Sequence, residues 1–209
     1  MPRHSFYLIY SLVVLAVTLG LVSAQGVSET GKEDGNAIYS ATKKLKAGNY
    51  VFKSAVGKQY LSFISEGNDV TPESKKHPRV WEVRQHDDTK YFSIHGWNDA
   101  KLEKCISTRW TTGNGDGGFP DAAVLWQCEV DTKKPKDTGG YEEIYPPKQL
   151  WAAVPDPKYD GYFKIISASH LFDMIPRCIE RKKIDGGTKL TECKLDTDKK
   201  SLLWSVVKV

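Results

Sequence analysis

Four cysteines are the residues of this sequence whose side chains offer chemistry most directly: Cys105, Cys128, Cys178 and Cys193. Thiols bind metals, act as nucleophiles or join as disulfides, and the redox compartment of the protein decides among these outcomes. In an oxidising compartment an even number of cysteines usually means disulfides, and four cysteines allow three pairings. The role of the thiols therefore depends on where the chain is located and on how its elements are arranged.

The start of the chain predicts a secreted protein. A basic beginning precedes a nearly continuous apolar run over residues 6–22, and Ser23 and Ala24 supply the small residues that signal peptidases prefer. We expect residues 1–24 to be a signal peptide and the mature protein to be extracellular, with no membrane attachment after cleavage. An uncleaved anchor is the alternative, because the apolar run is close to the roughly 20 residues that span a bilayer.

Motifs for other chemistry are missing. No nucleophile elbow, His-Glu-x-x-His or phosphate-binding glycine loop occurs, and Asn114-Gly115-Asp116-Gly117 is only a fragment of a calcium loop. Four histidines show no metal-type spacing: His77, His86, His95 and His170. The formal net charge of +4 arises from 30 basic and 26 acidic residues, which is typical of an ordinary solvated surface. We therefore expect no enzyme, no metal, no cofactor and no nucleic-acid partner.

The elements that must position any site are short strands. Segments rich in Val, Ile, Leu and aromatics recur between Pro, Gly or Asp, which is typical of strands. Three stretches open on a tyrosine and close on a tryptophan that could fill a shared core: Tyr50 to Trp81, Tyr91 to Trp151, and Tyr162 to Trp204. Their unequal lengths are what loop insertions into a repeat produce. The sequence predicts one all-β domain over residues 47–209, with units of about 47–86, 87–157 and 158–209, after a loose polar arm over residues 25–46.

The repeat selects one of the three disulfide pairings. Cys105 and Cys178 hold the same place in their units, and so do Cys128 and Cys193. We therefore predict Cys105–Cys128 and Cys178–Cys193, one bond inside each of the last two units. Each would stabilise the fold by about 3 kcal/mol in the chain-entropy model. The first unit has no such bond, so we expect it to be the least rigid.

The order of motifs in the middle unit resembles the ricin B-type β-trefoil family. Cys105-Ile106-Ser107, then a strand ending on Trp126-Gln127-Cys128, and then Gln149-Leu150-Trp151 follow one another as they do in that family. The resemblance covers roughly residues 47–209. It implies twelve antiparallel strands, six in a short barrel and six in a hairpin cap, with pseudo-threefold symmetry. It also implies carbohydrate binding without catalysis, and hence glycans or glycoproteins as partners.

The resemblance also implies site residues in the middle unit. Trp126 falls where the family places the aromatic that stacks on a sugar ring, and Gln149 matches the Gln-x-Trp glutamine that supports the site. Ser107 stands where the family has a sugar-binding Asp, and Glu180 holds that place in the third unit. Trp110 lies in a long loop and is a further candidate. With Phe119, Tyr141 and Tyr145, it would form a second sugar groove or a protein-contact surface, the alternative being two long, tolerated loops.

Two other functions compete with a secreted lectin-like protein. The segment 46–51 resembles the Gly-x-Tyr start of inhibitory trefoils, which predicts a protease inhibitor. The remaining possibility is a secreted scaffold or surface protein with no small-molecule ligand. Nothing in the sequence selects an oligomeric state.

Overall fold

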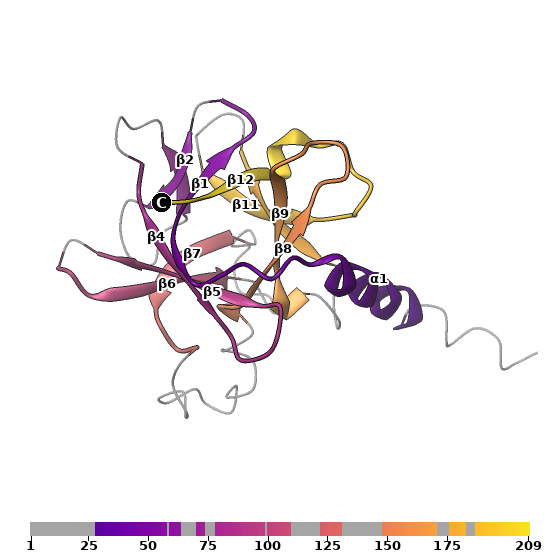
Figure 1. Cartoon of the computed structure of the whole chain (residues 1–209), viewed down its shortest axis with the longest axis horizontal. Helices are drawn as coiled ribbons and strands as arrows, with labels where there is room; N and C mark the ends of the chain where they lie inside the picture. Colours follow the sequence, from indigo (N-terminus) through magenta and orange to yellow (C-terminus); the bar gives the residue numbers. More distant parts are fainter. Residues whose placement is uncertain are drawn as a thin grey trace, which may run out of the picture.

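The structure is a computed structural model of the whole chain, and it describes residues 28–57, 59–63, 70–73, 78–98, 100–109, 122–130, 148–170, 176–182 and 187–209 (Figure 1). One α-helix and twelve strands lie in the described part. They are α1 (Ser28–Ala41), β1 (Gly48–Ser54), β2 (Tyr60–Phe63), β3 (Val70–Glu73), β4 (Trp81–Gln85), β5 (Phe92–Trp97), β6 (Glu103–Arg109), β7 (Ala122–Gln127), β8 (Trp151–Pro155), β9 (Tyr162–Ser167), β10 (Arg177–Arg181), β11 (Thr188–Glu192) and β12 (Leu203–Lys208). The prediction of an all-β domain is confirmed for the described residues that follow α1.

Six strands close into a barrel. β1 pairs with β4, β4 with β5, β5 with β8, β8 with β9, β9 with β12, and β12 returns to β1, all antiparallel. The other six strands form three hairpins, β2–β3, β6–β7 and β10–β11. Each hairpin joins the barrel through its first strand, which pairs with β1, β5 or β9. The same order of four strands therefore occurs three times along the chain.

Three buried tryptophans connect the barrel to the hairpins. Trp81, Trp151 and Trp204 lie in one hydrophobic core and are almost completely shielded from solvent. Each indole N–H donates to a backbone carbonyl oxygen in the second strand of its own unit. The acceptors are Leu61 at 3.0 Å, Ile106 at 2.9 Å and Ile179 at 2.9 Å. The prediction that these tryptophans pack in the core is confirmed. The hydrogen bonds also give each buried indole N–H a partner that burial would otherwise deny it.

The structure contains both predicted disulfides, Cys105–Cys128 and Cys178–Cys193. No cysteine is free. Each bond joins the second strand of a unit to the residue just after the third strand. The lower rigidity expected of the first unit stays a prediction.

The segment predicted to be a loose arm contains α1. The buried side chain of Ile38 packs with Ala152 and Val154 of β8, and the Tyr39 and Tyr91 rings lie 5.1 Å apart. The Lys90 ammonium donates to the carbonyl oxygens of Tyr39 and Ser40, at 3.2 and 2.8 Å, at the C-terminal end of the helix, where a positive charge is favourable. Contacts with residues far along the chain therefore stabilise the helix. Figure 1 shows α1 beside β8 and β9.

Several predictions fall on residues outside the described part of the chain. These are the signal peptide at 1–24, Trp110, and the loop aromatics Phe119, Tyr141 and Tyr145. Among the residues that the structure describes, no helix is long and apolar enough to span a bilayer.

A buried ion pair links the middle unit to the third. Lys164 on β9 and Asp156 after β8 are both buried, with Nζ and Oδ2 3.1 Å apart. Burial acts to raise the pKa of the Asp156 carboxyl, but hydrogen bonds from the Lys158 amide, the Lys164 ammonium and the Tyr159 amide outweigh it and lower the pKa below 3.8. The charged carboxylate therefore stabilises the folded state.

We predict that Gly96→Ala destabilises the fold by about 1–3 kcal/mol. A Cβ at Gly96 would lie 2.8 Å from Cζ3 of Trp81, so the core tryptophan would have to move. The neighbouring Trp97 side chain is exposed, and Trp97→Ala should change stability by no more than about 0.5 kcal/mol. Urea denaturation compares the unfolding free energies of the two variants. Equal losses of stability in both would contradict the inward position of Gly96.

We predict that Asp156→Asn costs about 3 kcal/mol near neutral pH, because it leaves the Lys164 ammonium buried without its counter-charge. The Asp156 contribution is present above the ordinary carboxyl pKa and is lost as pH falls through the lowered folded-state pKa. The gap between wild type and variant should therefore close in strong acid. Denaturant unfolding at about pH 7 and about pH 2 tests this. A gap of the same size at both pH values would show that the charge is not the cause.

Candidate functional site on the middle unit

The outer face of β5, β6 and β7 carries the candidate site. In the strand register Trp97 of β5 pairs with Glu103 of β6. Two residues away on each strand, His95 of β5 pairs with Cys105 of β6, and Cys105 pairs on its other side with Trp126 of β7. Directly paired residues point to the same side of a sheet, and residues two apart along a strand do too. Trp97, Glu103 and Trp126 therefore share one face.

That face is the outer one. Gly96, next to Trp97, lies against the core ring of Trp81, and Ile106 and Leu125 have their side chains in the core. Their neighbours along the strands must point away from it. The exposed fractions agree, at 41% for Trp97, 45% for Trp126 and 38% for the Glu103 side chain.

Two exposed indoles beside a carboxylate are suited to a polyhydroxylated ligand. An indole face can cover the apolar side of a pyranose ring, and a carboxylate accepts charge-assisted hydrogen bonds from neighbouring hydroxyls. Register places Trp97 and Trp126 on strands separated by β6, with Glu103 on that middle strand. The acid is therefore located where a ligand lying on either ring could reach it.

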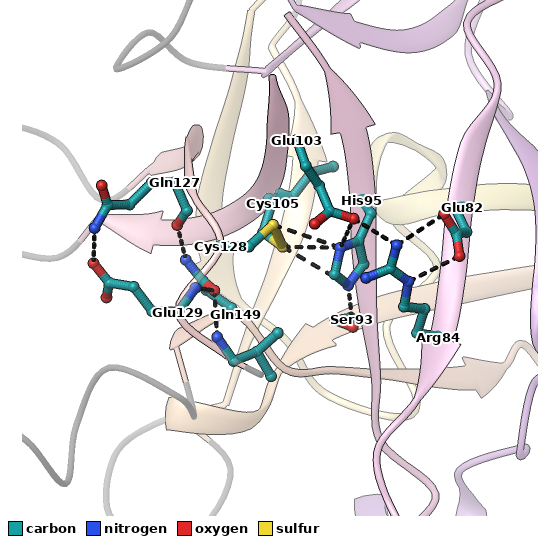
Figure 2. Close-up of a disulfide and its surroundings, with 12 residues drawn as sticks. Glu82, Arg84, Ser93, His95, Glu103, Cys105, Gln127, Cys128, Glu129 and Gln149 are labelled. Atoms are coloured by element: carbon teal, nitrogen blue, oxygen red, sulfur yellow. Dashed lines mark hydrogen bonds and ion pairs between the residues drawn. A yellow bond between two sulfur atoms is a disulfide. The ribbon is translucent and has the colours of Figure 1, made fainter. Parts of the chain in front are cut away.

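Glu103 is held by two charged or polar neighbours (Figure 2). Its Oε1 pairs with Nη2 of Arg84 and lies 3.2 Å from Nδ1 of His95. Arg84 is itself held by both carboxylate oxygens of Glu82, at 2.8 and 3.1 Å. The hydrogen bond with Glu82 raises the pKa of the Arg84 guanidinium, so the arginine stays charged and fixes Glu103 electrostatically.

His95 belongs to this same face but is fully buried, with its ring against the Cys105–Cys128 disulfide. Its Nδ1 is 3.4 Å from Sγ of Cys105 and 3.5 Å from Sγ of Cys128. Its Nε2 is 2.7 Å from the hydroxyl oxygen of Ser93, which is also buried. The spacing of residues 95, 105 and 128 along the chain gave no indication of this group, because the hairpin and the disulfide bring it together.

The four residues predicted for the sugar site separate into different environments. Trp126 is exposed on the outer face, as a stacking platform requires, whereas Ser107 and Gln149 are buried. Burial of Ser107 on β6 removes its hydroxyl from direct contact with a surface ligand. Trp110 lies outside the described residues.

Gln149 organises the chain after β7. Its Oε1 accepts from the amides of Glu129 at 2.7 Å and Val130 at 3.0 Å, and its Nε2 donates to the carbonyl oxygen of Gln127 at 2.7 Å (Figure 2). Only 1% of the residue is exposed. Gln149 therefore fixes the segment that contains Cys128 and follows Trp126, which is a supporting role.

The corresponding acid of the third unit, Glu180, is not accessible to a ligand. Glu180 is buried, and its Oε1 accepts from the Ser201 hydroxyl at 2.8 Å and the Lys199 ammonium at 2.6 Å. Burial acts to raise the pKa of this carboxyl, but the bonds to Lys199 and Ser201 outweigh it and lower the pKa. Glu180 therefore contributes to internal structure rather than to a surface.

Sequence reasoning missed Glu103, Trp97 and His95. The family pattern directed attention to the position two residues after Cys105, whereas the exposed acid stands two residues before it. Strand alternation outward from Cys105 was the signal that could have found Glu103, because residues two apart share a face. Trp97 required the β5–β6 register in addition.

Comparisons with known proteins identify a shared fold. No protein-family model and no curated protein sequence matches the chain. A salivary protein from Culex quiquefasciatus of the Cysteine and Tryptophan-Rich family is 16% identical, with a TM-score of 0.52 over 79% of this chain and 96% of that one. SeviL bound to asialo-GM1 saccharide is 12% identical, with a TM-score of 0.50 over 78% and 99%. A GlcNAcα1-4Gal-releasing endo-β-galactosidase from Clostridium perfringens is 16% identical, with a TM-score of 0.47 over 77% of this chain and 32% of that one.

We predict that Gln149→Leu destabilises the protein by about 1–3 kcal/mol, because it leaves buried amides unpaired. Amide hydrogen exchange should accelerate first at Glu129 and Val130, whose N–H groups donate hydrogen bonds to Oε1 of Gln149. The matched control is Gln127→Leu, since the Gln127 side chain is exposed and loses only its bond to Oε1 of Glu129, which should cost no more than about 1 kcal/mol. Unchanged exchange at both amides in Gln149→Leu would contradict the supporting role.

Proposed function

We propose that the chain is a β-trefoil. The closed ring of six strands, the three hairpins and the three equivalent tryptophan bonds support this proposal. The ricin B-type order of motifs in the middle unit supports it independently.

We further propose that the protein is secreted and binds carbohydrate, without catalysis, on the outer face of β5, β6 and β7. The observation that carries the proposal is Trp126, which is 45% exposed at the family's stacking position and shares its face with the carboxylate of Glu103. SeviL, with a TM-score of 0.50 to this chain, is bound to a saccharide, which supports the ligand class. The predicted signal peptide, the two disulfides and the salivary neighbour support secretion.

Recognition would follow from three groups. The Trp126 indole covers the apolar face of one ring, Glu103 accepts hydrogen bonds from adjacent hydroxyls, and Trp97 contacts the ligand beyond it. Glu103 is already oriented by Arg84 and His95, so little side-chain entropy remains to be lost on binding.

The protease-inhibitor alternative gains no support from its own segment. Residues 48–50 pair with β4 inside the barrel, and Tyr50 is buried with its hydroxyl donating to the carbonyl oxygen of Lys46 at 2.7 Å. A segment held in this way does not extend from the surface into a protease cleft.

We predict that Trp126→Ala weakens glycan binding at least tenfold, which corresponds to about 1.4 kcal/mol. Binding is measured first on a glycan array and then by titration with the glycan that gives the strongest signal. Glu103→Gln should weaken binding less than Trp126→Ala, because the amide keeps an acceptor but loses the charge.

Val207→Ala is the matched control, since Val207 is an equally exposed apolar residue on β12 and should leave binding unchanged. Unchanged glycan binding by the Trp126→Ala variant would show that the site lies elsewhere. An array without any signal would contradict carbohydrate binding, and saturable inhibition in a protease panel would then favour the inhibitor.

A further inference from the structure

One oxygen of the Glu103 carboxylate is left for a ligand. Oε1 is hydrogen-bonded to Nη2 of Arg84 and to Nδ1 of His95, whereas no hydrogen bond from the described residues reaches Oε2 (Figure 2). The Glu103 side chain is 38% exposed. A donor group of a ligand on the outer face can therefore bind Oε2 without displacing Arg84 or His95.

The charges beside Glu103 favour a cationic ligand group. Strand register places Glu82 opposite His95 and Arg84 two residues further along β4, on the same outer face. The two carboxylates and the guanidinium sum to a formal charge of −1 (−2 + 1), with histidine counted as neutral. The Arg84 guanidinium is already bound by both carboxylates, Glu82 and Glu103. An anionic ligand group would therefore meet two negative side chains, whereas a cation would be attracted.

The neighbouring indoles add a second attraction for a cation. Trp97 lies directly opposite Glu103 in the register, which puts their Cβ atoms about 4.5–5.5 Å apart. An ammonium group hydrogen-bonded to Oε2 at about 2.8 Å can therefore also come within the roughly 6 Å over which an indole face attracts a cation. Trp126 lies diagonally across from Glu103 on β7 and stays available to cover a sugar ring.

We propose that the face of β5, β6 and β7 selects glycans with a free amine, namely 2-amino-2-deoxy sugars whose nitrogen is neither acetylated nor sulfated. The ammonium group binds Oε2 of Glu103 and contacts Trp97, while Trp126 covers the apolar side of a ring. Acetylation of the amine removes its positive charge and so weakens both contacts. Sulfation reverses the charge and places it against two carboxylates. This ligand class rests on the carbohydrate site proposed above.

The test is a calorimetric titration of the secreted protein with three forms of one oligosaccharide. The probes are a β1-4-linked tetramer of glucosamine, its fully N-acetylated form and its fully N-sulfated form, which differ only at the nitrogen atoms. The titrations are made at about pH 6, where carboxylates are ionised and amines are protonated. We expect the free-amine tetramer to bind about fivefold more tightly than the acetylated one and at least about tenfold more tightly than the sulfated one.

Variants assign this preference to its residues. Glu103→Gln should bind the free-amine and acetylated tetramers equally, because an amide accepts hydrogen bonds but carries no charge. Trp97→Leu keeps an apolar side chain without the ring and should reduce the preference in part. Trp126→Ala should weaken all three tetramers. The matched control is Glu192→Gln, since the Glu192 side chain on β11 is 53% exposed and its replacement should leave the preference unchanged. Circular dichroism of each variant confirms its fold.

The outcomes separate the ligand class from carbohydrate binding itself. If the acetylated or sulfated tetramer binds as tightly as the free amine, and Trp126→Ala weakens it, the amine preference is wrong and the carbohydrate site stands. The same holds if no tetramer binds while another glycan binds and depends on Trp126. A preference that survives in Glu103→Gln would reflect the overall charge of the protein and would also overturn the proposal. Absence of binding to every glycan would contradict both proposals.

Discussion

Three hydrogen bonds from buried indoles connect the barrel strands to the hairpins, and the rest of the structure depends on them. Trp81, Trp151 and Trp204 each stand at or near the start of the last strand of a unit, and each donates to a carbonyl in the second strand of that unit. One side chain thus fills the core and also fixes a hairpin to the barrel. An indole combines a large apolar surface with a single donor, so replacing it by another apolar residue would leave a buried carbonyl without its partner.

The outer face of the middle unit depends on this arrangement. Because Gly96 must leave room for Trp81, and because Ile106 accepts from Trp151 while packing inward, the residues that alternate with them are directed outward. Those residues include Trp97, Glu103 and Trp126, together with His95 and Cys105, which are on the same face but buried. The same register explains why the disulfide lies next to the exposed carboxylate. Core packing and surface chemistry are therefore two consequences of one strand alignment.

Patterns that repeat along the chain were predictable, and groups assembled from distant residues were not. The tryptophan spacing predicted the core, and the equivalent places of Cys105 and Cys178 predicted the disulfides, because both signals repeat. The helix α1 was missed because its sequence is polar and its contacts are with Lys90, Tyr91 and β8, all about 50 or more residues away. His95 was missed because its neighbours converge only through strand register. Ser107 was chosen from a family pattern, and the sequence carried no signal that it would be buried.

The central claim is that three tryptophans form the interior while Trp97 and Trp126 form the surface of a binding face. Hydrogen exchange of the indole N–H groups, followed by nuclear magnetic resonance and assigned with single Trp→Phe variants, tests it most directly. The account predicts strong protection for Trp81, Trp151 and Trp204, whose indoles are buried and hydrogen-bonded, and rapid exchange for Trp97 and Trp126. Protection of the Trp126 indole, or rapid exchange at any of the three core indoles, would contradict it.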